Sequence, residues 1–326
     1  MDLAASVLKG DRLALARTLS QVENGAAEGQ AALSALFPYT GRAHLIGVTG
    51  APGTGKSSLV NQLAKLYRHP PDHTAPRKVA IIAVDPTSPF TGGAILGDRI
   101  RMRDLAGDPG VFIRSMATRG SLGGLASATS GLAQVFDAAG YEVILIETVG
   151  AGQAEVDIVR LAHTTLVVEA PGLGDDIQAI KAGILEIADI LIVNKADLPG
   201  VEHTERALKG MLELARSWRG NSAAKNAALW IPPLIRTVAT EGTGLIETIE
   251  AIARHRQYLH IGGEWRERDQ MRLETELANM IKDNLMQRWR ASVPEKDYRK
   301  TIQELVERRI SLYQAVENLF HNRGEA

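Results

Sequence analysis

One short stretch constrains the fold of this chain more than any other. It reads Gly50-Ala51-Pro52-Gly53-Thr54-Gly55-Lys56-Ser57 and has the spacing Gly-x4-Gly-Lys-Ser of a phosphate-binding loop. Glycines let the backbone turn its N–H groups inward around phosphate oxygens, the lysine adds a cation for the β- and γ-phosphates, and the serine hydroxyl is a ligand for Mg²⁺. The apolar run 44–49 before the loop predicts a buried strand. Leucines at helical spacing after Ser58 predict a helix whose positive end faces the same anion.

A second motif predicts which base the nucleotide carries. Asn194-Lys195-Ala196-Asp197 follows the apolar run 190–193, and Asn-Lys-x-Asp at a strand end is the guanine-reading motif of GTPases. We expect the Asp197 carboxylate to accept hydrogen bonds from guanine N1–H and the 2-amino group, and the Lys195 stem to pack on the base. Adenine has no matching donors and would leave the carboxylate without partners, which is costly. Ala239 is a weaker candidate, through its backbone N–H, for guanine O6. The expected cofactors are therefore GTP or GDP and Mg²⁺.

A third element lies between these two motifs. The apolar run 141–146 predicts a strand that closes in Glu147-Thr148-Val149-Gly150. An acidic residue at a strand end, three positions before a glycine, is the element that holds Mg²⁺ and senses the γ-phosphate, here through Glu147 and the Gly150 N–H. Aspartate is usual at this position, but the longer glutamate still reaches. The next residue is Ala151, where Ras-like GTPases carry a water-orienting glutamine, so we expect slow intrinsic hydrolysis or hydrolysis completed by a partner.

The stretch 85–102 is rich in glycine, proline and hydroxyl side chains, and it follows the strand predicted for 79–84. This composition predicts a mobile loop, and its place suits a switch that rearranges with the γ-phosphate. An ordinary surface loop with solvated charges explains the composition equally well.

Taken together, these motifs resemble the MeaB/ArgK GTPases, a family that includes the human methylmalonic aciduria type A protein. The resemblance covers nearly the whole chain, thins after about Gly262, and rests on residues 10–17, 85–98, 147–155 and 194–197. It implies a P-loop GTPase that chaperones a cobalamin-dependent acyl-CoA mutase, typically methylmalonyl-CoA mutase. Such a chaperone gates the loading of adenosylcobalamin and helps to replace inactivated cofactor.

The resemblance also implies roles for individual residues. Asp98 would lie with Glu147 around the metal, and Arg101 would stabilise charge on the transferring phosphate. Residues 171–181 resemble an extra switch loop that relays the nucleotide state to the mutase. The expected catalytic residues are Lys56, Asp98, Arg101 and Glu147; the metal ligands are Ser57, Asp85, Asp98 and Glu147; the nucleotide contacts are Gly50, Ala51, Pro52, Gly53, Thr54, Gly55, Lys56, Ser57, Ser58, Gly150, Asn194, Lys195, Asp197, Val238 and Ala239. Val238 stands where serine is common in the family, and Ala151 and Ala154 are further departures.

The chain divides into three expected parts. These are an N-terminal helical extension in 1–40, a P-loop GTPase domain in 41–255 and a C-terminal helical dimerisation arm in 256–326. In the middle part apolar strand runs alternate with helical patterns, which predicts an α/β fold with a mostly parallel sheet covered by helices on both faces. In the last part an apolar stripe at helical spacing is either ordinary core or the surface for a partner subunit, and the family's homodimers favour the second.

Composition excludes several classes of protein. The formal net charge of −1 gives no sign of nucleic-acid binding. The chain has no cysteine, which excludes structural disulfides and cysteine-ligated zinc and suits a reducing compartment. No apolar run approaches the ~20 residues that span a bilayer, and the first residues lack the pattern of a signal peptide. We therefore expect a cytoplasmic protein without a membrane partner.

Two other functions remain open on sequence grounds. The first is a P-loop kinase or ATPase that acts on an amino-acid transport protein, although an ATP-using enzyme has no need of the guanine motif at residues 194–197. The second is a scaffold that binds GTP only to hold its shape. The base preference tests the first alternative and turnover tests the second.

Overall fold

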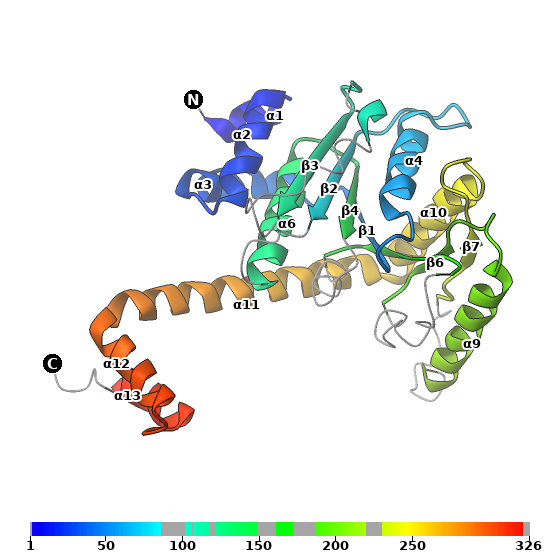
Figure 1. Ribbon diagram of the computed structural model, residues 1–326. Helices are drawn as coiled ribbons and strands as arrows, with labels where there is room; N and C mark the ends of the chain where they lie inside the picture. Colours follow the sequence, from blue (N-terminus) through cyan, green and yellow to red (C-terminus); the bar gives the residue numbers. More distant parts are fainter. Residues whose placement is uncertain are drawn as a thin grey trace. The chain divides into compact units, whose positions relative to one another are not determined.

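The computed structural model describes residues 2–85, 102–105, 107–117, 122–148, 161–172, 187–219 and 230–321 (Figure 1). The chain forms two compact units, residues 1–272 and 273–326. Unit 1 contains α1 (Leu3–Leu8), α2 (Arg12–Glu23), α3 (Ala27–Leu36), η1 (Phe37–Tyr39), β1 (His44–Thr49), α4 (Lys56–Arg68), β2 (Val79–Asp85), η2 (Arg103–Leu105), β3 (Val111–Ala117), α6 (Leu122–Ala138), β4 (Val143–Thr148), β5 (Thr164–Glu169), β6 (Ile190–Val193), α9 (Val201–Arg219), β7 (Leu234–Arg236) and α10 (Leu245–Gly262). Helix α11 (Glu264–Ser292) begins in unit 1, and α12 (Glu295–Val306) and α13 (Leu312–His321) belong to unit 2.

The described strands form one sheet of seven, in the order β3-β2-β4-β1-β5-β6-β7, and every pair of neighbours is parallel. Strands β1, β4, β5 and β6 are buried along their whole length, which explains their unbroken apolar runs. β1 lies centrally, with His44 opposite Val143 of β4 and Ile46 opposite Thr164 of β5. The predicted α/β fold with a mostly parallel sheet is confirmed.

Helices cover both faces of this sheet because alternate strand residues point to opposite sides. Ile46 and Val48 of β1 share a core with Leu59 and Leu63 of α4, and α10 joins the same cluster. On the other face, Leu45 shares a core with α6 and with α1–α3. Helix α9 contributes Val201 and Leu208 to a smaller cluster with β5 and β6.

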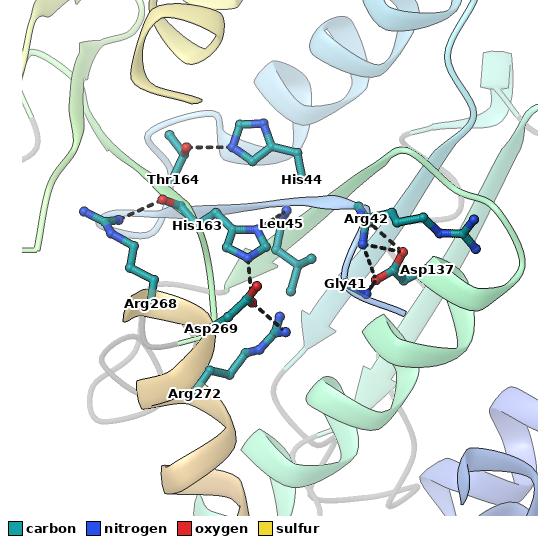
Figure 2. Close-up of polar contacts among 11 residues, drawn as sticks. Gly41, Arg42, His44, Leu45, Asp137, His163, Thr164, Arg268, Asp269 and Arg272 are labelled. Atoms are coloured by element: carbon teal, nitrogen blue, oxygen red, sulfur yellow. Dashed lines mark hydrogen bonds and ion pairs between the residues drawn. The ribbon is translucent and has the colours of Figure 1, made fainter. Parts of the chain in front are cut away.

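The N-terminal helices are held to the sheet by polar contacts as well as by their apolar core. The Arg12 guanidinium donates to the carbonyl oxygens of Pro109 (2.8 Å) and Val111 (3.0 Å). The Asp137 carboxylate of α6 accepts from the backbone N–H groups of residues 41–43, which immediately precede β1 (Figure 2). Burial raises the pKa of Asp137 in spite of these donors. The expected boundary after residue 40 is therefore crossed by a shared core and by hydrogen bonds.

The C-terminal helices of unit 2 carry uncovered apolar side chains. Pro294 separates α11 from α12, and the Ser311 hydroxyl accepts from the Gln314 N–H at the start of α13 (3.3 Å). Trp289 stacks on Phe320 with ring centroids 5.5 Å apart. The large apolar side chains exposed in this unit are Leu273, Leu277, Met280, Ile281, Leu285, Met286, Ile302, Val306, Leu312, Tyr313, Val316 and Phe320.

The boundary expected after residue 255 falls inside α10, whereas the two compact units divide after residue 272. In the described part of the chain, no helix combines the length and the apolar character that crossing a membrane requires.

Candidate functional site

Strands β1, β4, β6 and β7 of the parallel sheet end at one edge, which we call the carboxyl edge. The phosphate-binding loop follows β1 there, Glu147 lies near the end of β4, the motif at 194–197 follows β6, and residues 237–239 follow β7. Because β1 lies between β4 and β5, the chain crosses from one side of β1 to the other at this point. Ligands of open α/β sheets bind at such a switch point.

Two glycines of the phosphate loop stand where a side chain would not fit. Gly50 has φ +140°, and a Cβ there would lie 2.0 Å from the Val168 carbonyl oxygen of β5. Gly55 has φ +90°, and a Cβ there would lie 2.4 Å from Nδ2 of Asn194. The loop is therefore pressed against β5 on one side and against the guanine motif on the other, as close backbone approach requires.

Helix α4 begins at Lys56, directly after left-handed Gly55, and no side chain in the described part of the chain caps its first turn. The buried Lys56 ammonium donates to the carbonyl oxygens of Gly50 (2.7 Å) and Ala51 (2.9 Å). The positive end of the helix and the ammonium thus converge on one loop, which suits an anion such as a phosphate.

Two of the expected metal ligands meet in the structure. The Ser57 hydroxyl donates to Oε1 of buried Glu147 over 2.6 Å. A hydroxyl and a carboxylate are the hard oxygen ligands that Mg²⁺ prefers, so this pair fits the expected ion. The other two expected metal ligands, the Asp85 side chain and Asp98, lie outside the described residues, as do the expected catalytic Arg101 and the expected nucleotide contact Gly150. Among the residues that the structure does describe, no group of three or more His, Cys, Asp or Glu could hold a metal ion.

Asn194 joins the guanine motif to the phosphate loop. Its Nδ2 donates to the Thr54 carbonyl oxygen (2.8 Å), and its Oδ1 accepts from the Thr237 hydroxyl (3.0 Å) and the Ala239 N–H (3.1 Å). The Ala239 N–H, which we expected to face guanine O6, is thus bonded to Asn194 in this structure. Lys195 has φ +55°, in the left-handed region, and Asp197 is exposed. Val238 and Ala239 are buried.

Two threonine contacts at this edge were not expected from the sequence. The Thr148 hydroxyl donates to Oγ1 of Thr49 over 3.0 Å, and both side chains are buried. This bond ties the residue before the phosphate loop to the residue after Glu147. Thr237 supports Asn194 from the end of the neighbouring strand β7. The only sequence signal for each of these threonines is its position beside a motif.

The chain that follows the predicted switch is anchored on α4. Asp104 pairs with Lys65 and accepts from Asn61 Nδ2 (3.3 Å), and the bond to Lys65 lowers the pKa of its carboxyl group. Arg68 holds Asp108 by Nε (2.8 Å) and by its terminal nitrogen (2.9 Å), which lowers the pKa of that carboxyl as well. These ion pairs fix the segment on which the stretch 85–102 ends.

The fold and the carboxyl edge define this protein as a P-loop nucleotide-binding protein of the GTPase class. The family model for the methylmalonyl-CoA mutase-associated GTPase MeaB matches residues 15–294, and the chain therefore belongs to the MeaB family. A putative GTPase of Pyrococcus abyssi is 44% identical over 317 residues, which are 97% of this chain and 94% of the relative.

Two further comparisons extend this result. The mouse mitochondrial methylmalonic aciduria type A homolog is 29% identical over 245 residues, covering 75% of this chain and 57% of the mouse protein. A solved structure described as a LAO/AO transport system kinase has a TM-score of 0.68 and 26% identity, covering 97% of this chain and 95% of that chain. The family expected from the sequence is confirmed.

Proposed function

We propose that this protein hydrolyses GTP with Mg²⁺ and acts as a chaperone of a cobalamin-dependent acyl-CoA mutase, methylmalonyl-CoA mutase or a relative. In this role it gates the loading of adenosylcobalamin and protects or reactivates the mutase. The observation that carries the nucleotide part is the Asn194 side chain, which bonds to Thr54 of the phosphate loop and to Ala239 at once. The family supports the mutase as partner.

The contacts at the carboxyl edge suggest how a nucleotide would be taken up. Lys56 now lies on two carbonyl oxygens of its own loop, and the β- and γ-phosphates would replace these acceptors. Ser57 and Glu147, with Asp85 and Asp98, would hold Mg²⁺, which neutralises charge on the phosphate oxygens. The Ala239 N–H would turn from Asn194 toward guanine O6, or be shared between them.

The rate of hydrolysis depends on what orients the attacking water. Ala151 has no group for this task, so the isolated protein is expected to turn over slowly and a bound mutase to accelerate it. Arg101 would stabilise charge on the transferring phosphate. The exposed apolar side chains of unit 2 support a homodimer, because uncovered apolar surface of this kind marks an interface.

The first test is steady-state hydrolysis of GTP and of ATP, with and without a cobalamin-dependent acyl-CoA mutase from the same genome. We expect turnover selective for GTP that rises with the mutase. Equal rates with and without every such mutase would contradict the chaperone role. Preference for ATP would favour the kinase, a function named for one solved relative. Binding of GTP without turnover in any condition would favour the scaffold.

A variant of the guanine motif tests the base directly. Asp197→Asn removes the carboxylate that pairs with N1–H and the 2-amino group and leaves these two donors of the bound base unpaired, so GTP affinity should fall by ~100-fold or more. The new amide can donate to the 2-oxo group of xanthine, so affinity for XTP should rise. Unchanged affinity for GTP would show that Asp197 does not read the base.

A further inference from the structure

The opposite ends of the same strands carry an unusual concentration of histidine. Of the eight histidines in the chain, four gather where β1 and β5 begin: His44, His163, His255 and His260. We call this the amino edge. The first turns of α11, residues 264–272, lie against it and contribute Trp265. They also contribute Arg268, Asp269 and Arg272 (Figure 2).

His163 is the residue on which this contact centres. Its ring stacks on Trp265 with centroids 3.8 Å apart, its Nε2 lies 3.0 Å from Oδ1 of Asp269, and its Nδ1 accepts from the Leu45 N–H (3.1 Å). A backbone N–H in a strand cannot turn away, so Nδ1 must remain an acceptor and the single ring proton must lie on Nε2. Protonation of Nδ1 would place an N–H donor of the ring opposite the Leu45 N–H donor, and the hydrogen bond between them would be lost.

A second chain of polar contacts runs beside the first. His44 Nε2 lies 2.7 Å from the Thr164 hydroxyl oxygen, which lies 2.9 Å from His255 Nδ1. His255 Nε2 in turn lies 3.2 Å from Oδ1 of Asp189. The first two contacts are satisfied when His44 donates to Thr164 and Thr164 donates to His255 Nδ1, whereas His255 Nε2 lies near Asp189 without the geometry of a hydrogen bond. This carboxylate also pairs with both terminal nitrogens of Arg268 over 2.9 Å.

The surrounding charges oppose further protonation. Arg268 and Arg272 of α11 face His163, and Arg256 of α10 lies 5.7 Å from the Trp265 ring that His163 and His260 both stack on. Arg77 acts on His44 from the chain before β2. The negative charges near these cations are the carboxylates of Asp189, before β6, and of Asp269 and Glu264, on α11. Burial, followed by Arg272 and Arg268, lowers the pKa of His163 in spite of the Asp269 bond, and burial holds the pKa of His44 well below its usual value.

We propose that residues 264–272 are held to the amino edge by an acid-sensitive latch, which closes while His163 is neutral and opens when it is protonated. A histidine whose pKa is lower in the closed form stabilises that form fully above the ordinary value of 6.5, and the stabilisation is lost progressively as the pH falls below it. Residues 264–272 directly precede unit 2, residues 273–326. Opening of the latch would therefore release the segment that connects unit 2 to the rest of the chain.

Hydrogen exchange measured by mass spectrometry on the full-length protein tests the latch. Rates are corrected for the intrinsic effect of pH. Between pH 7.5 and 5.5 protection of peptides within 264–272 should fall by up to ~10-fold in total, because pH 5.5 lies one unit below the ordinary histidine pKa of 6.5, while peptides of α4 remain protected. His163→Gln keeps an amide donor but cannot titrate, so its profile should be clearly shallower than that of the wild type, with only the neighbouring buried His44 left to titrate. The matched control His203→Gln, on the exposed side of α9, should retain the wild-type profile.

Three results would overturn the proposal: a flat profile in the wild type, the wild-type slope in His163→Gln, or loss of protection in α4 together with 264–272. A measurement on the unaltered protein does not depend on any variant. NMR titration of the His163 ring should give a pKa below 6.5, and a value at or above this would exclude the latch.

Discussion

The two ends of the central strands use polar side chains in opposite ways. At the carboxyl edge, Lys56 and Ser57 are bonded to loop carbonyl oxygens and to Glu147, partners that a nucleotide and its metal ion can replace. At the amino edge, Arg268 is bonded to Asp189 and to the His163 carbonyl oxygen, all within the protein. Similar buried polar groups therefore serve binding at the carboxyl edge and stability at the amino edge. Substitutions at the two edges should therefore change different measurements.

The largest expected effect is that of Lys56→Ala on hydrolysis. The ammonium would face charge that develops on the phosphates, and loss of one such group costs ~100- to 1,000-fold in rate. Stability should hardly change, because the ammonium donates to carbonyl oxygens of its own loop, which solvent can reach once the side chain is removed. Rates are compared by steady-state kinetics and stability by urea unfolding. The control is Lys209→Ala, which removes an exposed lysine of α9 that pairs with Glu205, and this variant should keep the wild-type rate. A variant that unfolds easily but turns over normally would reverse the comparison.

Arg268→Ala should show the opposite pattern. It leaves the buried Asp189 carboxylate without its bidentate partner, and breaking a buried ion pair costs ~3 kcal/mol. Urea unfolding measures this loss, and hydrolysis per folded molecule should stay near the wild-type value. Arg254→Ala removes an exposed pair with Glu250 and should cost below ~1 kcal/mol. Equal costs for the two arginines would show that the amino edge is not a stabilising network.

The same difference explains what could be predicted from the sequence. The carboxyl edge binds a nucleotide through short motifs, so residues 50–57 and 194–197 reveal it directly, and the apolar runs predict the parallel sheet. The amino edge is assembled from His44, His163, Asp189, His255 and Arg268, which follow no spacing rule in the chain. Only the fold brings them together. For the same reason the sequence could not show that residues 256–272 pack on unit 1, since Leu259 and Trp265 become buried only there.

The Thr49–Thr148 bond combines features of both edges, because it lies at the carboxyl edge but joins two side chains of the protein to each other. If the kind of partner decides the role, Thr148→Val should resemble an amino-edge substitution on a smaller scale. We expect a loss of ~1 kcal/mol in the free energy of unfolding, since a buried hydrogen bond contributes about that much and the Thr49 oxygen loses its donor. GTP affinity should change by less than ~3-fold, which is below ~1 kcal/mol.

A double-mutant cycle with Thr49→Val isolates the bond, and urea unfolding of the four proteins should give a coupling of ~1 kcal/mol. The control pairs Thr148→Val with Thr248→Val, whose hydroxyl bonds to the Gly244 carbonyl oxygen at the start of α10, so these two losses should add. Additive losses in the first cycle would show that the hydroxyls do not interact. A fall in GTP affinity without a loss of stability would show that Thr148 serves binding, as Lys56 and Ser57 do. The position of a residue at the carboxyl edge, and not the kind of partner that it bonds to, would then decide its role.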